Sequence, residues 1–251
     1  MYRVVIPARY ASVRLPGKPL LVIAGKPLLQ WVYERAQGSG ARDVIVATDD
    51  DRVAAAATAF GAKVTMTAAT HPSGTDRIAE VARFHGWRED DIVVNVQGDE
   101  PLMPATLIDQ VAALLQQHVQ AHIATLCAPV PTLQAFLDPN VVKVIADRHQ
   151  RALYFSRAPI PWHRDGAAAG LASQSSHAGA RRHIGLYAYR VSALRQLASL
   201  PPTPLEQAEK LEQLRALENG MDIRIAEASV TPGPDVNTPE DLQRVAALLS
   251  S

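Results

Sequence analysis

The chain has 251 residues, of which 47% are apolar and 20% charged, and 25 basic residues balance 25 acidic ones. This composition excludes disordered and fibrous proteins, and the length suits one α/β domain with or without an insertion. Zero formal charge argues against nucleic-acid or membrane-surface partners, and we find neither a signal peptide nor a membrane-spanning run. A single cysteine, Cys127, fits a reducing compartment, so we expect a cytoplasmic protein.

Short β-branched runs alternate with longer amphipathic runs in the first half of the chain. This pattern predicts strands at residues 3–6, 43–47, 63–66 and 91–95, and helices at residues 27–37, 50–60, 75–85 and 104–118. The strands are almost continuously apolar, which is typical of a largely parallel sheet covered by helices on both faces. Because ligands bind at the carboxyl ends of such strands, the loops after these strands are the expected places for a site.

The pattern changes in the second half. It predicts short strands at residues 141–145, 152–155, 183–189 and 222–226, and helices at residues 205–217 and 239–249. Residues 163–180 are rich in Ala, Gly and Ser without an apolar period, which predicts a mobile loop. We therefore expect one α/β domain over residues 1–251, with a β-rich insertion at about residues 128–190.

The segment from Pro7 to Lys18 follows the first predicted strand. It carries three basic side chains, Arg9, Arg14 and Lys18, and no acid. Small residues such as Ala8 and Ser12 let the backbone approach a ligand, and a turn that combines cations with free N–H groups binds anions. The segment is long enough for a di- or triphosphate. The alternative from residue types alone is a solvated basic loop.

Known nucleotide fingerprints are absent from the sequence. It has no G-x-x-x-x-G-K-[ST] motif, and Gly38 and Gly40 follow a helix without the third glycine of a dinucleotide site. This weakens a dehydrogenase or P-loop NTPase hypothesis. Motifs for a zinc protease, a serine hydrolase or a CxxC centre are also missing.

Acidic residues follow the fourth predicted strand and precede the last helix. Asp99 and Glu100 come after the turn at Gly98, and Asp235 lies among Pro and Gly residues. Carboxylates beside a phosphate-binding loop are typical of a magnesium site, and Asp99 is the better candidate of the first pair. The alternative for Asp99 is a turn or helix cap. The alternative for Asp235 is a turn or capping role, and Asp235 becomes a candidate metal ligand only if it faces Asp99.

Other polar residues carry weaker signals. Ser73 and Arg77 open the third predicted helix, whose free N–H groups suit a phosphate, ribose or base, although Arg77 is equally consistent with a helix-surface charge. A polar set also stands out in the apolar second half, where Arg and His suit an acidic group and Glu and Gln suit sugar hydroxyls. It consists of Arg157, Arg181, Arg182, His183, Tyr187, Glu212 and Gln213. Each of these is individually consistent with a structural or solvated position.

Taken together, these motifs resemble the 3-deoxy-manno-octulosonate (Kdo) cytidylyltransferase family. The resemblance rests on the segments 6–20, 72–77, 95–101, 152–157, 183–187, 204–215 and 233–240, and so covers nearly the whole chain. The opening loop alone indicates only the wider sugar cytidylyltransferases, whereas its combination with segments 183–187 and 205–215 is specific to the Kdo enzymes. Val13 departs from the pattern, where a small hydroxyl residue is expected.

The resemblance implies a fold, a reaction and roles for residues. The fold is a three-layer, nucleotide-diphospho-sugar transferase-like α/β sheet, and the reaction transfers CMP from CTP to the anomeric hydroxyl of Kdo with release of pyrophosphate. The implied nucleotide-binding residues are Ala8, Arg9, Ser12, Arg14, Lys18, Ser73 and Arg77. The implied sugar-binding residues are Gln97, Arg157, His183, Tyr187, Glu212 and Gln213. Asp99 and Asp235 are the implied Mg²⁺ ligands and, with Lys18 and Arg9, the implied catalytic residues.

The resemblance also implies a homodimer formed through the insertion and a role in lipopolysaccharide assembly. Two other functions stay open from the sequence. One is a cytidylyltransferase for another acidic keto-sugar, such as 8-amino-Kdo or a sialic acid. The other, from a different class, is a catalytically silent nucleotide-binding regulator.

Overall fold

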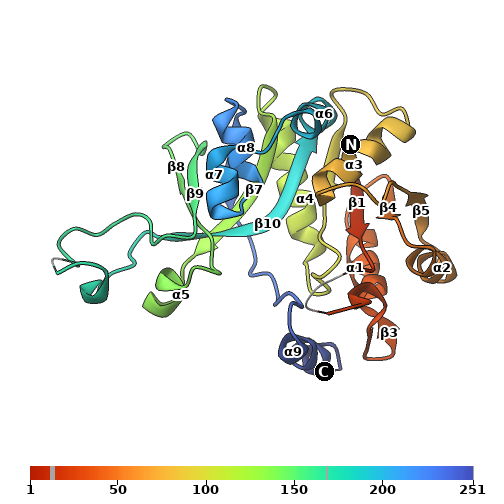
Figure 1. Ribbon diagram of the computed structural model, residues 1–251, viewed down its shortest axis with the longest axis horizontal. Coiled ribbons are helices and arrows are strands. Elements are labelled where there is room, and N and C mark those ends of the chain that lie inside the picture. The colour runs from red at the N-terminus through yellow and green to blue at the C-terminus, as the bar shows by residue number, and fades with distance from the viewer. Residues whose placement is uncertain (12–14, 168, 251) are drawn as a thin grey trace.

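A computed structural model describes residues 1–11, 15–167 and 169–250. Within these ranges the strands form a nine-stranded mixed sheet and a separate two-stranded ribbon. The main path of the large sheet has the order β11-β7-β10-β6-β1-β4-β5. Along this main path, neighbouring strands are parallel except at β10, which runs antiparallel to both β6 and β7. The predicted mixed, mostly parallel α/β fold is confirmed (Figure 1).

The first half follows the predicted alternation closely. Its elements are β1 (Tyr2–Ala8), η1 (Lys18–Leu20), β2 (Val22–Ile23), β3 (Lys26–Pro27), α1 (Leu28–Gln37), β4 (Val44–Thr48), α2 (Asp51–Ala59), β5 (Lys63–Met66), α3 (Gly74–Phe84), β6 (Ile92–Asn95) and α4 (Ala105–Gln117). Boundaries differ from the prediction by one or two residues at most. The agreement arises because these strands are bounded by turns and these helices have clear apolar faces.

The second half is less regular. Its elements are β7 (Ile123–Pro129), α5 (Leu133–Leu137), β8 (Lys143–Ala146), β9 (Ala152–Ser156), η2 (Leu171–Ser173), β10 (Arg181–Arg190), α6 (Val191–Ser199), α7 (Pro204–Glu209), α8 (Gln213–Glu218), β11 (Ile223–Glu227) and α9 (Pro239–Leu249). Strand β7 and helices α5 and α6 were not predicted. The single helix predicted at 205–217 is wrong, because Lys210 adopts a left-handed backbone conformation with φ of 54° and separates α7 from α8.

The sheet divides the apolar core into two layers. Alternate residues of β1 show this, because Val4 and Ile6 face one layer and Val5 faces the other. Helices α1, α2 and α4 cover the first layer, and α3, α6 and α8 cover the second. Burial on both faces explains the almost continuously apolar strands.

The insertion shares strands with the rest of the sheet. The long strand β10 pairs with β6 through Tyr187–Arg190 and with β8 through Arg181 and Arg182. Beyond β8 and β9 the chain extends into an arm, residues 157–180, that projects away from the molecule and carries η2 (Figure 1). Apart from η2 this arm lacks regular structure in its described residues, as its composition predicts.

Lys143 holds the base of the insertion together. Its side chain is fully buried, and its ammonium donates to the backbone carbonyls of Asp138, Val141 and Arg157 at 2.9, 2.6 and 2.7 Å. Three carbonyl acceptors offset the cost of burying this charge. Burial lowers the pKa of Lys143. Among the described residues, no helix combines the length and apolarity needed to cross a bilayer.

Candidate active site

A cavity of about 310 Å³ opens at the carboxyl ends of β1 and β6. Its lining residues come from the opening loop, the start of α3, the turn after β6 and the segment before α9. They are Pro7, Ala8, Arg9, Ala11, Lys18, Pro19, Gly74, Gln97, Gly98, Asp99 and Asn237. The prediction that the ligand edge of the sheet carries a site is consistent with this cavity.

The turn at Gly98 brings β6 against β1. A Cβ atom at Gly98 would lie 3.0 Å from the backbone oxygen of Pro7, which cannot move without distorting β1. A residue without a side chain is therefore required for the two strand ends to approach. This approach places Gln97 and Asp99 beside the opening loop.

The opening loop is closed on itself and anchored to α2. The N–H of Gly17 donates to the carbonyl of Tyr10 at 3.1 Å, and the Arg52 guanidinium lies 3.4 Å from the centre of the Tyr10 ring. Gly17 has φ of 67°, which turns the chain so that Lys18 begins η1 and faces the cavity. The predicted nucleotide-binding residues Ser12 and Arg14 lie outside the described residues.

Arg9 is held at the rim of the cavity by the loop before α3. Its guanidinium donates to the carbonyl oxygen of His71. The Glu80 carboxylate in turn binds His71 Nε2 and accepts from the N–H of Ala68 at 2.9 Å. Burial and the Arg9 charge lower the pKa of Arg77, so two guanidinium groups lie close together here. Their combined positive field suits an anionic ligand.

Asp99 and Asp235 are brought together through Lys18 and Asn237. The Lys18 ammonium lies 2.6 Å from Asp99 Oδ2 and 3.4 Å from Asn237 Oδ1, and the Asn237 amide donates to Asp235 Oδ2. The N–H of Val236 also donates to the carbonyl of Asp99 at 2.9 Å. The two carboxylates, 136 positions apart in sequence (235 − 99), therefore belong to one polar network.

Glu100 adds a third carboxyl group to this region. Burial, reinforced by the negative charges of Asp99 and Asp235, raises the pKa of Glu100 to about 8. Its Oε2 atom is buried and makes no hydrogen bond. With its pKa raised in this way, Glu100 stays protonated to a higher pH than usual and adds a neutral carboxyl group beside Asp99 near pH 7.

These groups fit a divalent cation that is coordinated in part by substrate. The described residues contain no set of three His, Cys, Asp or Glu side chains arranged to hold a metal ion. Mg²⁺ is usually held by one or two carboxylates, with waters and substrate phosphates completing its coordination. Asp99 in the lining of the first cavity and Asp235 in that of the second, joined through Asn237, match that pattern.

Ser73 and Arg77 have different environments. Ser73 caps α3 by accepting from the N–H of Asp76 at 3.2 Å and donates to Asp76 Oδ2 at 2.7 Å. Arg77 is fully buried, and its guanidinium contacts Thr67 and lies 3.2 Å from Asp49. It does not line the cavity, so the structure places it behind the site rather than at the helix surface.

Several predicted sugar-binding residues gather behind the cavity. The rings of His183 and Tyr187 lie 5.2 Å apart, and Glu212 lies near Tyr187 and the start of α3. Burial raises the pKa of Glu212 and raises that of Tyr187 still further. Both groups therefore stay protonated to a higher pH than usual.

Asp235 and Glu100 also line a second cavity of about 370 Å³, together with His183 and Arg182. Asp99 lines the first cavity and Asp235 lines the second, so the network that joins these two aspartates connects the linings of both cavities. Gln97 lies on the opening-loop side.

Arg157 does not join the group around Tyr187. Its guanidinium donates to the carbonyl oxygens of Glu209 and Pro139 at 2.7 and 2.9 Å, and its N–H donates to the Glu209 carboxylate. The Ser156 hydroxyl donates to the same carboxylate at 2.6 Å. Arg157 therefore joins β9 to α7, which is a structural position in this conformation.

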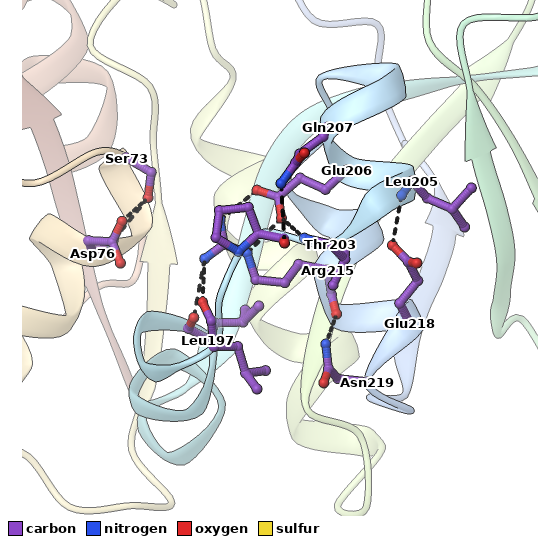
Figure 2. Close-up of polar contacts among 12 residues, drawn as sticks. Ser73, Asp76, Leu197, Thr203, Leu205, Glu206, Gln207, Arg215, Glu218 and Asn219 are labelled. Atoms are coloured by element: carbon purple, nitrogen blue, oxygen red, sulfur yellow. Dashed lines mark hydrogen bonds and ion pairs between the residues drawn. The ribbon is translucent and has the colours of Figure 1, made fainter.

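An ion pair positions the helices that carry Glu212 and Gln213. Arg215 binds both carboxylate oxygens of Glu206, with Nε at 2.8 Å, and donates to the carbonyl of Leu197 at 3.3 Å (Figure 2). The side chains of this pair are only 8% and 13% exposed. The interaction joins α6, α7 and α8. It thereby fixes the start of α8, where Glu212 and Gln213 lie.

Asn237 was missed as a functional residue by sequence reasoning. In the sequence Asn237 is only part of the segment around Asp235, whereas in the structure its amide joins Lys18 to Asp235. A signal was available, because Asn237 lies two residues after Asp235 and directly before Thr238, which caps α9. Glu100 was set aside in favour of Asp99, although the structure places it in the same acidic group.

Comparison with known proteins places this architecture in one family. Residues 3–223 match the family model described as cytidylyltransferase. The chain is 54% identical to the 3-deoxy-manno-octulosonate cytidylyltransferase of Thioalkalivibrio sulfidiphilus (strain HL-EbGR7), over 99% of this chain and 98% of that protein. It is 55% identical to the protein of the same name from Cellvibrio japonicus (strain Ueda107), with the same coverage.

Solved structures agree with the sequence relatives. A CMP:2-keto-3-deoxy-manno-octonic acid synthetase complexed with CTP superimposes with a TM-score of 0.88 and 44% identity, over 99% of this chain and 98% of that one. A cytidylyltransferase from Leptospira borgpetersenii serovar Hardjo-bovis (strain JB197) shares the fold, with a TM-score of 0.64 and 18% identity over 99% of this chain and 86% of that one.

The buried Arg215–Glu206 pair yields a stability prediction. We expect Arg215→Met to lower the free energy of unfolding by about 3–5 kcal/mol, because Glu206 is left buried without its partner. Urea unfolding measures the change. Arg244→Met is the matched control, because it removes an ion pair with Asp241 in which the arginine side chain is 60% exposed. Its free energy of unfolding should change by less than about 1 kcal/mol. Equal losses in the two variants would contradict the structural role of Arg215.

His183 yields a pH-dependence prediction. Its ring packs against Phe155 and Tyr187, its Nε2 lies 2.9 Å from the Thr125 hydroxyl, and burial lowers its pKa to about 3. The unfolded chain binds a proton at His183 below about pH 6.5, whereas the folded protein does not until much lower pH. Stability should therefore fall as pH drops from about 6.5 towards 3, by at most about 1.4 kcal/mol per pH unit from this group.

The matching measurement is thermal unfolding of the wild type and His183→Gln between pH 7 and pH 4.5. We expect the wild type to lose stability more steeply than the variant over this range. Parallel curves would show that His183 is not held neutral by the fold.

Proposed function

Because this chain belongs to the cytidylyltransferase family, and is more than half identical over its length to 3-deoxy-manno-octulosonate cytidylyltransferases, we propose that it transfers CMP from CTP to Kdo. The products are CMP-Kdo and pyrophosphate. One structural observation carries the proposal for this chain's own residues. The cationic opening loop, Asp99 and Asn237 line one cavity at the ligand edge of the sheet, and Asn237 joins them to Asp235 in the lining of the second cavity.

The reaction requires positioning and charge neutralisation more than covalent chemistry. The anomeric oxygen of Kdo attacks the α-phosphorus of CTP, the bond from that phosphorus to the bridging oxygen breaks, and the hydroxyl proton is released. Lys18 and Arg9 line the cavity and would neutralise the departing pyrophosphate. Arg14 and Ser12 are proposed to share this task from the same loop. Ala8 lets the nucleotide approach the end of β1, since its side chain ends at Cβ.

Asp99 and Asp235 are proposed to hold Mg²⁺. When bound, the ion would neutralise negative charge on the phosphates and orient the oxygens that react. The aspartates are held close enough to act together by Asn237 and by the backbone bond from Val236 to Asp99. This cofactor assignment is supported by the residue chemistry of the cavity.

Kdo is proposed to bind on the side of the acidic pair that faces β10 and α8. Gln97 lines the nucleotide cavity, while Tyr187, Glu212 and Gln213 lie behind it and His183 borders the second cavity. Hydroxyl, amide and carboxyl groups suit the many hydroxyls of a sugar acid. Arg157 requires a rearrangement to reach this region, because its guanidinium is bound to Glu209 and Pro139. Ser73 caps α3 next to Gly74, which lines the nucleotide cavity, and it also lies near Glu212.

A homodimer is proposed to form through the insertion. Three large apolar side chains on the insertion, Leu153, Trp162 and Leu171, are 59%, 46% and 55% exposed. Trp162 and Leu171 lie on the arm and Leu153 on β9, and large exposed apolar side chains are typical of a protein interface. We further propose that the enzyme works in the cytoplasm and that its product supplies Kdo for lipopolysaccharide assembly.

Pyrophosphate release tests the proposed function. Purified protein is mixed with CTP, Mg²⁺ and one acceptor from a panel that contains Kdo, 8-amino-Kdo and a sialic acid. We expect the highest kcat/KM with Kdo. Release only with another acid would reject Kdo as the substrate, and release with none of them would favour a silent nucleotide-binding regulator.

Substitution of the aspartates tests the metal assignment. Asp99→Asn should reduce kcat by at least about a hundredfold, because a transition-state charge interaction is lost while the fold stays intact. Asp235→Asn should behave alike, and both variants should need more Mg²⁺ for half-maximal rate. Circular dichroism checks the fold. An unchanged Mg²⁺ requirement in Asp235→Asn would remove this residue from the metal site.

A further inference from the structure

In this structure Lys18 is bound through its ammonium to the first aspartate of the Asp99–Asp235 pair. Its ammonium lies 2.6 Å from Asp99 Oδ2, and its side chain is 14% exposed whereas that of Asp99 is 31% exposed. A partly buried contact at this distance is both an ion pair and a charge-assisted hydrogen bond. Lys18 therefore lies where a cation bound to Asp99 would also have to lie.

Asn237 fixes the ammonium from the other side. Its Oδ1 accepts from Lys18 at 3.4 Å, while its Nδ2 donates to Asp235. Its own backbone N–H donates to Asp241 Oδ2 at 3.0 Å, next to the cap of α9. The amide is thus oriented by groups at both ends, and it connects the lysine of the opening loop to the second aspartate.

The local charge is not balanced by Lys18 alone. Asp99 and Asp235 supply two carboxylates, whereas Lys18 contacts only Asp99 directly and reaches Asp235 through Asn237. A single ammonium leaves the region short of positive charge. The region therefore attracts a further cation, but an ammonium and a divalent ion repel each other strongly at such short range.

We propose that Lys18 is the resident counterion of the Asp99–Asp235 pair and that Asn237, as a positioning residue, holds its ammonium there. A nucleoside triphosphate then draws the ammonium onto its phosphates, and only after this step does a divalent cation bind tightly to the aspartates. The inference rests on the proposed function, since it concerns the same nucleotide and metal site. Lysine suits this exchange, because its charge lies at the end of a flexible four-carbon chain and can change partner without moving the backbone.

Metal binding in the absence of nucleotide tests the exchange. Mn²⁺ is titrated into nucleotide-free protein, and the free ion is followed by electron paramagnetic resonance. Lys18→Met should bind Mn²⁺ at least about tenfold more tightly than the wild type, because a competing charge has been removed. Lys63→Met is the matched control, since Lys63 forms a similar pair with Asp43 at the opposite end of the strands. Equal Mn²⁺ affinity in Lys18→Met and the wild type would overturn the proposal.

A second measurement uses the wild-type side chain and does not depend on the folding of Lys18→Met. Competition is reciprocal, so saturating Mn²⁺ should free the Lys18 ammonium and raise its rate of acetylation by acetic anhydride, as read by mass spectrometry. Asn237→Ala should raise the same rate without metal, because the ammonium loses one of its holders. Lys26, which pairs with Glu34 outside the site, serves as the internal reference. A Lys18 rate unaffected by Mn²⁺ and by Asn237→Ala would overturn the proposal.

The two proposals fail in different ways. CTP-dependent turnover together with unchanged Mn²⁺ affinity in Lys18→Met would overturn the exchange and leave the proposed function standing. Tighter Mn²⁺ binding in Lys18→Met without turnover on any acceptor would support the exchange and remove the proposed function.

Discussion

The contact between Lys18 and Asp99 is the interaction on which the site depends. It joins the opening loop to the turn after β6, and through Asn237 it extends to the segment before α9. Three segments that are far apart in the sequence therefore share one polar network. Backbone geometry prepares this contact, because Gly17 turns Lys18 inwards and Gly98 lets the two strands approach.

The sheet supplies the rigid frame behind that network. Its parallel strands end at one edge, so the loops after β1 and β6 are neighbours in space although about 90 residues separate them. The one long antiparallel strand, β10, connects this frame to the insertion and brings Tyr187 beside Asn95. The proposed nucleotide site and the proposed sugar site therefore lie on the adjacent strands β6 and β10 of one sheet.

Charge in the site is divided between basic and acidic side chains. Arg9 and Lys18 of the opening loop contribute positive charge on one side, while Asp99 and Asp235 contribute negative charge on the other. A triphosphate and a divalent cation satisfy both sides at once, which neither does alone. This complementarity is the physical reason why the cavity suits a nucleotide–metal complex.

The sequence by itself determined the strands and helices of the first half, the ligand edge and the residue types that face it. These features follow from local periodicity and from turn residues, and they need no long-range information. The resemblance of its motifs also indicated the family that the comparisons confirm. The sequence did not indicate β7, because its segment mixes Ala, Cys and Pro with only two β-branched residues, unlike the predicted runs at 43–47 and 91–95.

Only the tertiary structure decided which polar residues meet. It separated α7 from α8 at Lys210, buried Arg77 against Asp49, and bound Arg157 to Glu209 rather than to the site. It also revealed Asn237 as the link between Lys18 and Asp235. Such pairings join separate elements of the chain, up to 219 positions apart for Lys18 and Asn237, and no local pattern in the chain encodes them.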